Sequence, residues 1–390
     1  MDFELSPTHK LLQEMYRSFA QNEVKPLAEE IDAEERFPVE TVEKMAKLGM
    51  MGIPFPKEYG GAGGDQLAYV MAVEELSKVC GTTGVIVSAH TSLCCQPIFA
   101  FGTEEQKRKY LPDLLSGKHV GAFGLTEPNA GTDASGQQTK AVLCDDHYVL
   151  NGSKIFITNA GHADIYIVFA MTNKALGNHG ISAFIVERGF EGFSIGREEK
   201  KMGIRGSSTC ELIFENCIVP KENLLGQEGK GFGIAMATLD GGRIGIAAQA
   251  LGIGEGALEE TIKYVKERKQ FNRRISQFQN TQFRIADMHT RMEAARLLVY
   301  SAAMKKEAYE QTRLKGRTPV SYSMDAAMAK LFAAEAATEV TQRCVQLYGG
   351  YGYTREYPVE RMMRDAKITE IYEGTSEVQR MVIASKLKVD

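Results

Sequence analysis

The glutamate at position 373, near the C-terminus, is the residue whose surroundings point most directly to chemistry. Gly374 follows it and permits backbone angles that other residues avoid. Residues 364–371 can continue a helix, and Thr375-Ser376 can cap a second helix. The Glu373 carboxylate is therefore predicted to project from a corner between two helices. Taken alone, a Glu before Gly is more often a solvated turn residue, because charged side chains are mostly exposed.

Two long motifs carry a family resemblance. One is residues 364–380, with Ile-Tyr-Glu-Gly-Thr around Glu373, and the other is residues 123–135, Phe-Gly-Leu-Thr-Glu-Pro-Asn-Ala-Gly-Thr-Asp-Ala-Ser. They resemble the signatures of the acyl-CoA dehydrogenase family, most nearly its bacterial short-chain (butyryl-CoA) members, and the resemblance extends over nearly the whole chain. It implies that Glu373 is the base that removes the α-proton of an acyl thioester.

Composition is that of an ordinary globular protein. The 390 residues suffice for two or three domains, with 44% hydrophobic and 25% charged residues. The formal net charge of -4 provides no basic field for nucleic acid or an anionic membrane, so neither is expected as a partner.

The cysteines, the histidines and the apolar stretches further limit the class of protein to which this sequence can belong. The seven cysteines form no Cys-x-x-Cys pair, and we expect them to be reduced, buried and cytoplasmic. The seven histidines are scattered, so no protein-built metal site is expected. The N-terminus lacks a basic start followed by an apolar run, and no segment approaches 18 apolar residues. We therefore expect neither secretion nor a membrane span.

Residues 1–121 are predicted to form an N-terminal α-helical domain. A helix starts at Ser6-Pro7, with an apolar stripe at Leu11, Met15 and Phe19. Further helices are predicted at residues 39–48, at residues 66–79 and after the capping box Thr103-Glu-Glu-Gln106. The Gly-rich residues 59–65 follow no strand and are predicted to be a loop.

Residues 122–230 are predicted to form a middle β-domain, because the hydrophobic period changes from 3.6 to 2 near residue 120. The candidate strands are residues 120–125, 140–143, 148–150, 155–158, 165–170, 182–186 and 211–214. Asn151-Gly152 is the two-residue signal of a hairpin, which favours an antiparallel barrel or sandwich.

Residues 231–390 return to long helices with short connections, which predicts a C-terminal four-helix bundle that carries Glu373. The stripe Met288, Met292, Ala295 and Val299 indicates bundle core, with a partner interface as the alternative. Residues 326–347 form an Ala-rich helix that ends at Gly349-Gly350. The overall fold class is α+β, and the order of the three domains is also the one that the resemblance implies.

Desaturating a thioester between its α and β carbons requires a base and an acceptor for a hydride. A free Glu has a pKa of about 4.3, and desolvation can raise it to about 6 to 7, where proton exchange at neutral pH is efficient. No side chain accepts a hydride, so a cofactor is required. The Rossmann fingerprint is missing, because Gly252-Ile-Gly-Glu-Gly256 lies within a helical pattern and indicates close helix packing.

The resemblance implies that the cofactor is FAD and that the hydride goes to flavin N5. The positions that match flavin contacts from the same subunit are Phe123, Leu125, Thr126, Phe156 and Thr158. Phe156 stands where many relatives have Trp, which keeps the aromatic packing but loses an indole donor. Thr375 and Glu377 also match FAD positions.

The remaining FAD contacts would come from a neighbouring subunit, which implies a homotetramer, a dimer of dimers. The matching positions are Arg268, Phe271, Gln279, Gln346, Gly349 and Gly350. An Arg fork binds pyrophosphate oxygens bidentately, although without the resemblance Arg268 would be interpreted as a surface residue. Relatives commonly have Phe-Gly-x-Pro where this chain has Phe271-Asn-Arg-Arg274, which leaves the shape of this loop open.

Another set of positions matches the family's acyl-CoA path: Thr132, Phe232, Met236, Asp240, Arg243, Tyr372 and Gly374. The resemblance implies that the Glu373 N–H and a flavin ribityl hydroxyl hold the thioester oxygen. Cys94-Cys95-Gln96 is expected near the pocket floor. Some relatives place the base at the position of Gly242 instead.

These features predict a short-chain acyl-CoA dehydrogenase that interconverts butyryl-CoA and crotonyl-CoA and exchanges electrons with an electron-transferring flavoprotein. Within enzymes, the alternatives are an enoyl-CoA reductase for acryloyl- or caffeoyl-type thioesters and an acyl-CoA oxidase. A helical scaffold that binds acyl-CoA without catalysis is the non-enzymatic alternative.

Overall fold

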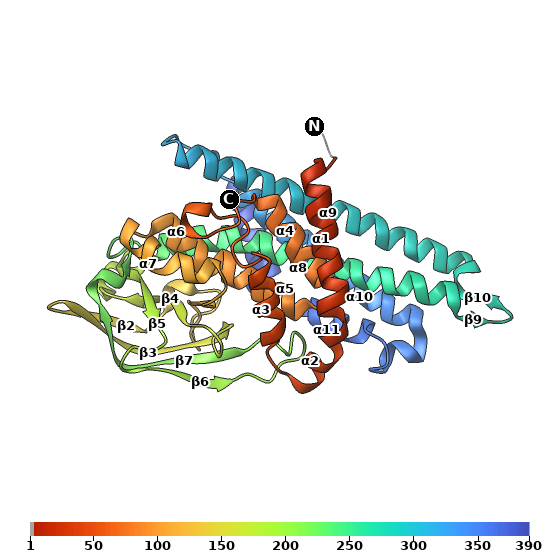
Figure 1. The fold of residues 1–390 in the computed structure, drawn as a ribbon, viewed down its shortest axis with the longest axis horizontal. Helices are drawn as coiled ribbons and strands as arrows, with labels where there is room; N and C mark the ends of the chain where they lie inside the picture. Colours follow the sequence, from red (N-terminus) through yellow and green to blue (C-terminus); the bar gives the residue numbers. More distant parts are fainter. Residues whose placement is uncertain (1–3, 390) are drawn as a thin grey trace.

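The structure is a computed structural model that describes residues 4–389. Figure 1 shows its three parts: N-terminal helices in the centre, a sheet at one end, and long C-terminal helices that run to the opposite end.

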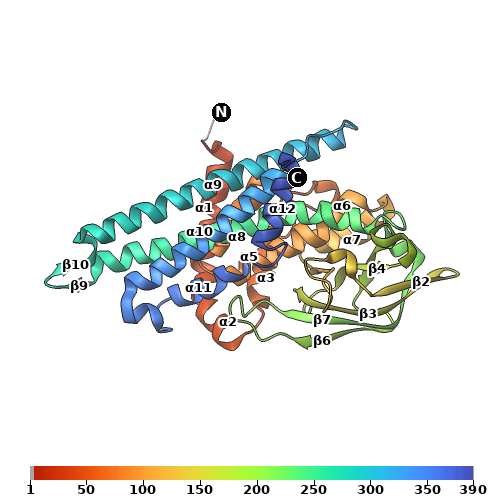
Figure 2. The ribbon, with the colours of Figure 1, turned by 180° about the vertical axis from the view of Figure 1, so that it is seen from behind.

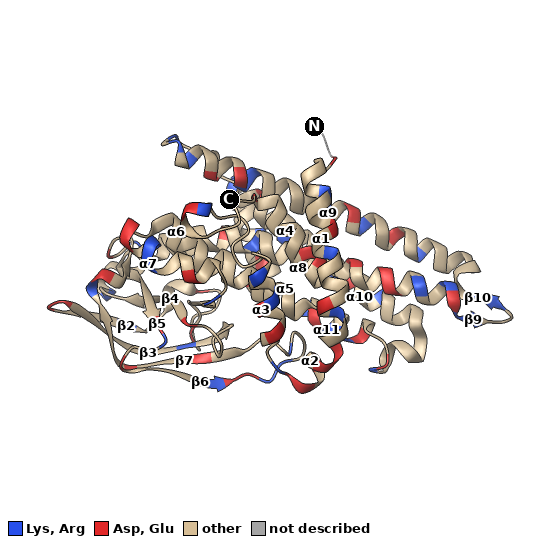
Figure 3. Cartoon of the chain, viewed as in Figure 1, with Lys and Arg blue, Asp and Glu red and all other residues tan. Residues whose placement is uncertain are grey.

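Lys and Arg alternate with Asp and Glu along helix α9 (Figure 3). All seven cysteines are free, but Cys144 is exposed, which corrects the expectation that all are buried.

The first part is helical, as predicted. The helices are α1 (Pro7–Phe19), α2 (Ala28–Glu34), α3 (Val39–Lys47), α4 (Gln66–Ser77), α5 (Gly81–Ser88), α6 (Gln96–Phe101) and α7 (Glu104–Leu115). Ser6 caps α1 by accepting a hydrogen bond from the His9 N–H, and the Thr103–Gln106 capping box begins α7. No helix or strand lies between the short turn Lys57–Tyr59 and α4, so the predicted Gly-rich loop is confirmed.

The apolar stripe predicted on α1 is correct only at Phe19: Leu11 is 68% and Met15 is 38% exposed, and Tyr16 joins Phe19 on the buried face.

One apolar stretch is longer than the sequence indicated. Helix α5, the π-helical turn Ala89–Cys95 and α6 together form one continuous helix, Gly81–Phe101, that has the length and mean hydropathy (1.4) of a membrane span. Because 78% of its most apolar window is buried inside the protein, this segment is a core helix.

The middle part is a sheet of eight strands: β1 (Gly121–Gly124), β2 (Lys140–Cys144), β3 (His147–Thr158), β4 (Ile165–Met171), β5 (Ile181–Glu187), β6 (Phe193–Glu198), β7 (Thr209–Pro220) and β8 (Leu224–Leu225). The strand order is β6-β7-β3-β2-β4-β5-β8, with β1 paired to β4. All neighbours are antiparallel except the β1–β4 and β2–β4 pairs. The sequence missed β6 and β8.

The hairpin predicted at Asn151-Gly152 is also wrong. Strand β3 continues through these residues, with a register shift against β7 between Leu150 and Gly152. The turn lies earlier, at Asp145-Asp146, where β2 and β3 pair directly at Cys144 and His147. Gly152 has a φ of 144°, and a Cβ there would lie 2.6 Å from Thr139 Oγ1, so this Gly serves a bulge rather than a turn.

The last part is the predicted helical bundle. Its helices are α8 (Gly231–Glu267), α9 (Gln279–Leu314), α10 (Ser323–Tyr348), α11 (Val359–Ile368) and α12 (Ser376–Leu387), with a hairpin of β9 (Lys269–Gln270) and β10 (Arg273–Arg274) between α8 and α9. Figure 2 shows α10 and α12 on the side opposite α1. The predicted stripe Met288, Met292, Ala295 and Val299 is buried core, and Gly349, with a φ of 64°, ends α10.

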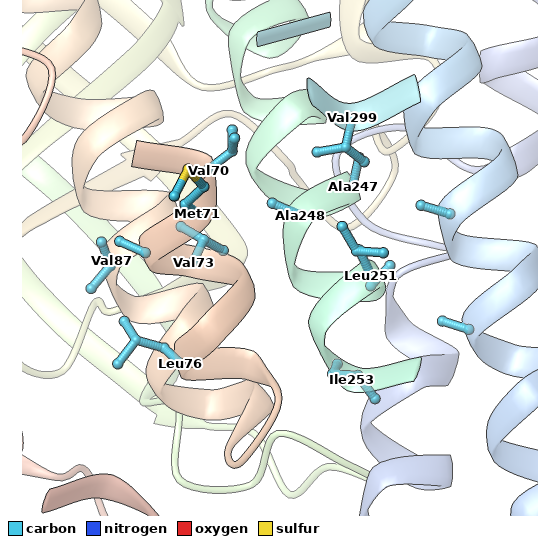
Figure 4. Close-up of a cluster of buried hydrophobic side chains, with 14 of the residues drawn as sticks. Val70, Met71, Val73, Leu76, Val87, Ala247, Ala248, Leu251, Ile253 and Val299 are labelled. Atoms are coloured by element: carbon cyan, nitrogen blue, oxygen red, sulfur yellow. The ribbon is translucent and has the colours of Figure 1, made fainter. Parts of the chain in front are cut away.

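Helix α8 joins the N-terminal part to the bundle. Helices α4 and α8 contribute to one cluster of buried apolar side chains. Figure 4 shows Val70, Met71, Val73 and Leu76 on α4 and Ala247, Ala248 and Leu251 on α8, with Ala248 pointing toward α4. Glycines allow this close approach: a Cβ at Gly252 would lie 2.2 Å from the Glu74 carbonyl oxygen, and one at Gly256 would lie 1.9 Å from the Lys78 carbonyl oxygen. The glycines of this segment therefore serve helix packing, as the sequence predicted.

We predict that Gly256→Ala destabilises the protein by about 1 to 3 kcal/mol, because the added methyl group meets backbone atoms that cannot move aside. The control is Gly233→Ala in the same helix, where a Cβ would meet nothing within 4 Å. Ala is the better helix former, so the control should be neutral or slightly stabilising. Thermal unfolding of both variants checks this, and equal melting temperatures would contradict the packing role of Gly256.

Candidate active site

The corner predicted at Glu373 is present. Helix α11 ends at Ile368, three residues before the predicted end, and Thr375 caps α12 by accepting a hydrogen bond from the Val378 N–H. Glu373 has a φ of 50° and Gly374 a φ of 93°. A non-Gly residue in the left-handed region is uncommon and persists where its surroundings enforce it.

Three buried side chains hold this corner. Lys330 of α10 donates from Nζ to the Gly374 carbonyl oxygen (2.7 Å), and Gln379 of α12 donates from Nε2 to the same oxygen (2.8 Å). The Tyr372 hydroxyl donates to Gln249 of α8, whose amide donates in turn to the Gly81 carbonyl oxygen. The corner is therefore fixed from α8, α10 and α12 at once.

The Glu373 carboxylate lies against Gly242 of α8. A Cβ at Gly242 would lie 2.1 Å from Glu373 Oε2 and 2.8 Å from Leu93 Cδ2. Among the described residues, no group donates a hydrogen bond to Glu373 Oε2, and this oxygen is out of contact with solvent. An unpaired buried carboxylate oxygen is costly when charged.

This environment sets the protonation of Glu373. Burial raises the pKa of Glu373 to about 7, although the nearby cations Lys330 and Arg243 act in the opposite direction. Burial likewise lowers the pKa of Lys330 to about 8, against the effect of Glu373. The carboxylate can therefore take up and release a proton near neutral pH, as a general base must.

The backbone beside the carboxylate offers a hydrogen-bond donor. No described residue accepts a hydrogen bond from the Glu373 N–H. A free N–H next to a base can stabilise an oxygen on which negative charge develops.

The predicted flavin positions of the same subunit lie on β1 and β3 and in the loop after β1. Phe123, Leu125, Phe232 and Met236 border one apolar cluster that also contains Cys94 and Cys95. Thr126 and Thr158 are half-buried, whereas Phe156 is 59% exposed, with a φ of 59°. An exposed aromatic side chain held in this conformation is a candidate for ligand contact.

The predicted acyl-CoA positions divide into two groups. Asp240 and Arg243 form an ion pair (2.5 Å), and the Ser323 hydroxyl donates to the other Asp240 oxygen, while Arg243 Nε is buried without a partner among the described residues. Thr132, in contrast, is exposed on the loop after β1. Gln96 is buried on α6 and donates to Glu310, so its amide is already engaged.

The FAD positions expected from a neighbouring subunit lie at the far end of the bundle. They are Arg268, Phe271, Gln279, Gln346, Gly349 and Gly350, near the β9–β10 hairpin, which Figures 1 and 2 place opposite the sheet. The Arg268 guanidinium stacks over the Tyr351 ring, and no carboxylate of the described residues pairs with it. Phe271 and Asn272 both have positive φ, and Phe271 is 89% exposed. One chain therefore does not bring these residues to its own Glu373.

Thr375 and Glu377 line a different feature. Together with Ile371 and Ser376 they surround a surface cavity of about 200 Å³ at the start of α12. The Thr375 hydroxyl already caps the helix, and Glu377 is exposed.

The sequence did not reveal Lys330, Gln379 or Leu93 as site residues. Lys330 lies in an Ala-rich helical pattern and Leu93 in an apolar one, so the patterns indicate core only. The one available signal was a Lys at a position where the helical period requires a buried residue, since Lys is rarely buried without a partner.

Comparisons with known proteins agree with this arrangement. Family models match most of the chain: "Acyl-CoA dehydrogenase, N-terminal domain" at residues 6–118, the middle domain at residues 122–217 and the C-terminal domain at residues 229–388. A short-chain specific acyl-CoA dehydrogenase of Clostridium acetobutylicum is 64% identical over 99% of this chain and 100% of its own. The acryloyl-CoA reductase (NADH) of Anaerotignum propionicum is 51% identical over 99% and 96%.

Solved structures give the same result. A chain from the structure described as electron transferring flavoprotein of Acidaminococcus fermentans has a TM-score of 0.96 at 58% identity, with both chains fully covered. Butyryl-CoA dehydrogenase from Megasphaera elsdenii has a TM-score of 0.95 at 52% identity, also with full coverage. An acyl-CoA dehydrogenase of Bacillus anthracis complexed with FAD has a TM-score of 0.92 at 37% identity, covering 99% of this chain and 67% of that one. This protein belongs to the acyl-CoA dehydrogenase family.

Proposed function

We propose that the protein is an FAD-dependent, short-chain acyl-CoA dehydrogenase in which Glu373 is the catalytic base. The observation that carries the proposal is the buried Glu373 carboxylate oxygen, which lies against Gly242 without a hydrogen-bond partner among the described residues. Such an oxygen is free to accept a proton from a substrate carbon, and its pKa of about 7 suits that role. The 64% identical short-chain relative supports the substrate class.

The residues present fit FAD. Exposed Phe156 and the half-buried Thr126 and Thr158 offer an aromatic face and hydroxyl groups to a flavin ring, and the Arg268 guanidinium, which pairs with no carboxylate of residues 4–389, suits a pyrophosphate. When bound, FAD supplies the acceptor for the hydride that leaves the β-carbon. The related structure described as an FAD complex supports this assignment.

In the proposed reaction the thioester carbonyl oxygen accepts a hydrogen bond from the Glu373 N–H, which stabilises the negative charge that develops on that oxygen as the α-proton leaves. The carboxylate takes this proton. Because Lys330 and Gln379 fix the Gly374 carbonyl oxygen, the N–H and the carboxylate of Glu373 keep a constant relation to each other. In the reverse reaction the protonated carboxyl group returns the proton to the α-carbon.

We further propose that the active unit is a homotetramer in which each FAD contacts two subunits. The position of the β9–β10 hairpin, at the end of the bundle opposite the sheet, supports this, because the exposed Phe271 and the half-buried Arg268 lie there, where a second copy could contact them. The structural neighbour described as an electron transferring flavoprotein supports such a flavoprotein as electron partner.

A second candidate is reduction of an enoyl-CoA, since the acryloyl-CoA reductase is 51% identical over nearly the whole chain. Both candidate functions use the Glu373 carboxyl group and the flavin, and they differ in the direction in which the reaction runs.

The direct test is anaerobic titration of the purified protein with acyl-CoA and enoyl-CoA thioesters of increasing chain length while flavin absorbance is recorded. We expect butyryl-CoA to bleach the flavin and crotonyl-CoA to reoxidise the reduced protein. Octanoyl-CoA should act with a much lower specificity constant. Equal specificity constants for four- and eight-carbon substrates would reject the short-chain assignment, and a protein that holds no flavin would reject the enzyme.

We predict that Glu373→Gln lowers the bleaching rate by roughly 10²- to 10⁴-fold while FAD remains bound, because general-base catalysis is lost. The carboxylate can then be moved: Gly242→Glu in a Glu373→Gly background should restore part of the rate, since position 242 faces the vacated space. Gly241→Glu in the same background is the control, because its side chain faces Lys306 instead. Stopped-flow bleaching by butyryl-CoA measures all variants, and wild-type bleaching in Glu373→Gln would remove Glu373 from the mechanism.

The third prediction concerns pH. The base must be ionised, so kcat/KM should rise with pH through a midpoint near 7. Lys330→Met removes a cation that lowers the pKa of Glu373, so the midpoint should move to higher pH. Lys367→Met is the control: this exposed Lys pairs with Glu370, and its loss should leave the midpoint unchanged. A midpoint that is the same in Lys330→Met and the wild type would contradict the electrostatic role of Lys330.

A further inference from the structure

Lys154 is a charged side chain with no exposure to solvent, and nothing in the proposed reaction uses it. It lies on β3 and has 0% relative exposure, and its partner Glu127 is also buried. Lys is almost never fully buried without a specific partner. We therefore look for the function of this ammonium group in the chain segments that its hydrogen bonds join.

The ammonium group has three N–H donors, and each of them has an acceptor. Nζ donates to Glu127 Oε1 (2.7 Å), to the Leu125 carbonyl oxygen (3.1 Å) and to Gln137 Oε1 (3.1 Å). All three acceptors belong to the segment that follows β1, and β3 supplies only the donor. Lys154 thus ties both ends of this segment to one point on β3.

Glu127 extends the same network into the backbone. Its two carboxylate oxygens accept hydrogen bonds from the N–H groups of Gln138 (2.5 Å) and Thr139 (3.0 Å). Residues 125–139, which contain the flavin positions Leu125 and Thr126 and the acyl-CoA position Thr132, are therefore folded around a buried ion pair.

Strand β3, which supplies Lys154, also carries the remaining flavin positions, Phe156 and Thr158. The Ile155 N–H donates to the Thr126 carbonyl oxygen (2.9 Å), which joins the two segments directly. A register shift between Lys154 and Ile157 leaves both of these side chains buried and turns Phe156 outward. A bulge re-aims a side chain in this way, and here it lies next to Lys154.

We propose that Lys154, through Glu127 and Gln137, is a positioning residue that sets the distance between the two flavin-contacting segments, Leu125–Thr126 and Phe156–Thr158. The inference rests on the proposed FAD site and adds to it three residues that make no contact assigned to flavin or thioester. Its effect is on the placement of the flavin ring and not on proton transfer.

The charge state supports a constant geometry. Burial lowers the pKa of Lys154 to about 8, and the Lys154 ammonium group holds the pKa of Glu127 below its usual range against the effect of burial. Both groups are therefore ionised at neutral pH. A buried ion pair adds little net stability compared with apolar residues, so its presence here is better explained by the structure that it specifies.

The test uses three variants and a control. Lys154→Met/Glu127→Gln removes both charges, so that no unpaired carboxylate remains buried. Lys154→Met alone removes the donor, and Gln137→Leu removes one neutral acceptor and leaves the ion pair in place. Lys140→Met is the matched control, because Lys140 is an exposed lysine of the same sheet. The measurements are FAD affinity of the apoprotein, hydrogen exchange of residues 125–139, and the absorbance spectrum and midpoint potential of the flavin at FAD saturation.

We expect at least tenfold weaker FAD binding and faster exchange of residues 125–139 in both Lys154 variants, with a smaller change in Gln137→Leu and none in Lys140→Met. At FAD saturation the flavin spectrum and potential should still differ from the wild type. Wild-type spectrum and potential in the saturated variants would overturn the proposal, because a purely stabilising role changes affinity alone. If the Lys154 variants do not fold, wild-type values in Gln137→Leu would overturn it equally.

These readouts need no thioester. A wild-type protein that binds FAD but is not bleached by any acyl-CoA would reject the proposed reaction and leave the positioning test decisive.

Discussion

The site depends on one atom, Glu373 Oε2, a carboxylate oxygen that is buried but receives no hydrogen bond from any of the described residues. Full satisfaction of Glu373 would lower its pKa and make it a poor base, whereas full burial without nearby cations would keep it protonated. Lys330 and Arg243 act between these limits, since both oppose the effect of burial without donating to the Oε2 atom. The surrounding helices are arranged to maintain this intermediate state.

Gly242 is the structural condition for that arrangement. Any side chain there would occupy the position of the Glu373 carboxylate, so a carboxylate can stand at one position or the other but not at both. The same helix carries Gly252 and Gly256, where the absence of side chains lets α4 approach. The absence of side chains on helix α8 thus has two effects: it admits the Glu373 carboxylate at one point and a neighbouring backbone at others.

Local signals predicted much of this structure. The helix corner at Glu373, the capping box at Thr103 and the core stripe from Met288 to Val299 follow from residue type and period within a single segment. The errors share a cause, because tertiary contacts overrode the local signal. Asn151-Gly152 lies in a bulge, since β3 pairs with two neighbouring strands, and Leu11 faces outward because Tyr16 and Phe19 take the buried face. Lys330 was beyond local reasoning, since its partner Gly374 lies more than forty residues away.

The apolar helix from Gly81 to Phe101 has a consequence for synthesis of the chain. Helix α8, which packs against it, begins about 130 residues later, so at ordinary translation rates this helix waits on the order of ten seconds for its cover. During that interval the face of this segment that α8 covers in the folded protein has no partner, although α4 and α7 are already available to its other faces. The apolar centre of the fold is therefore completed late in synthesis, together with the site around Glu373.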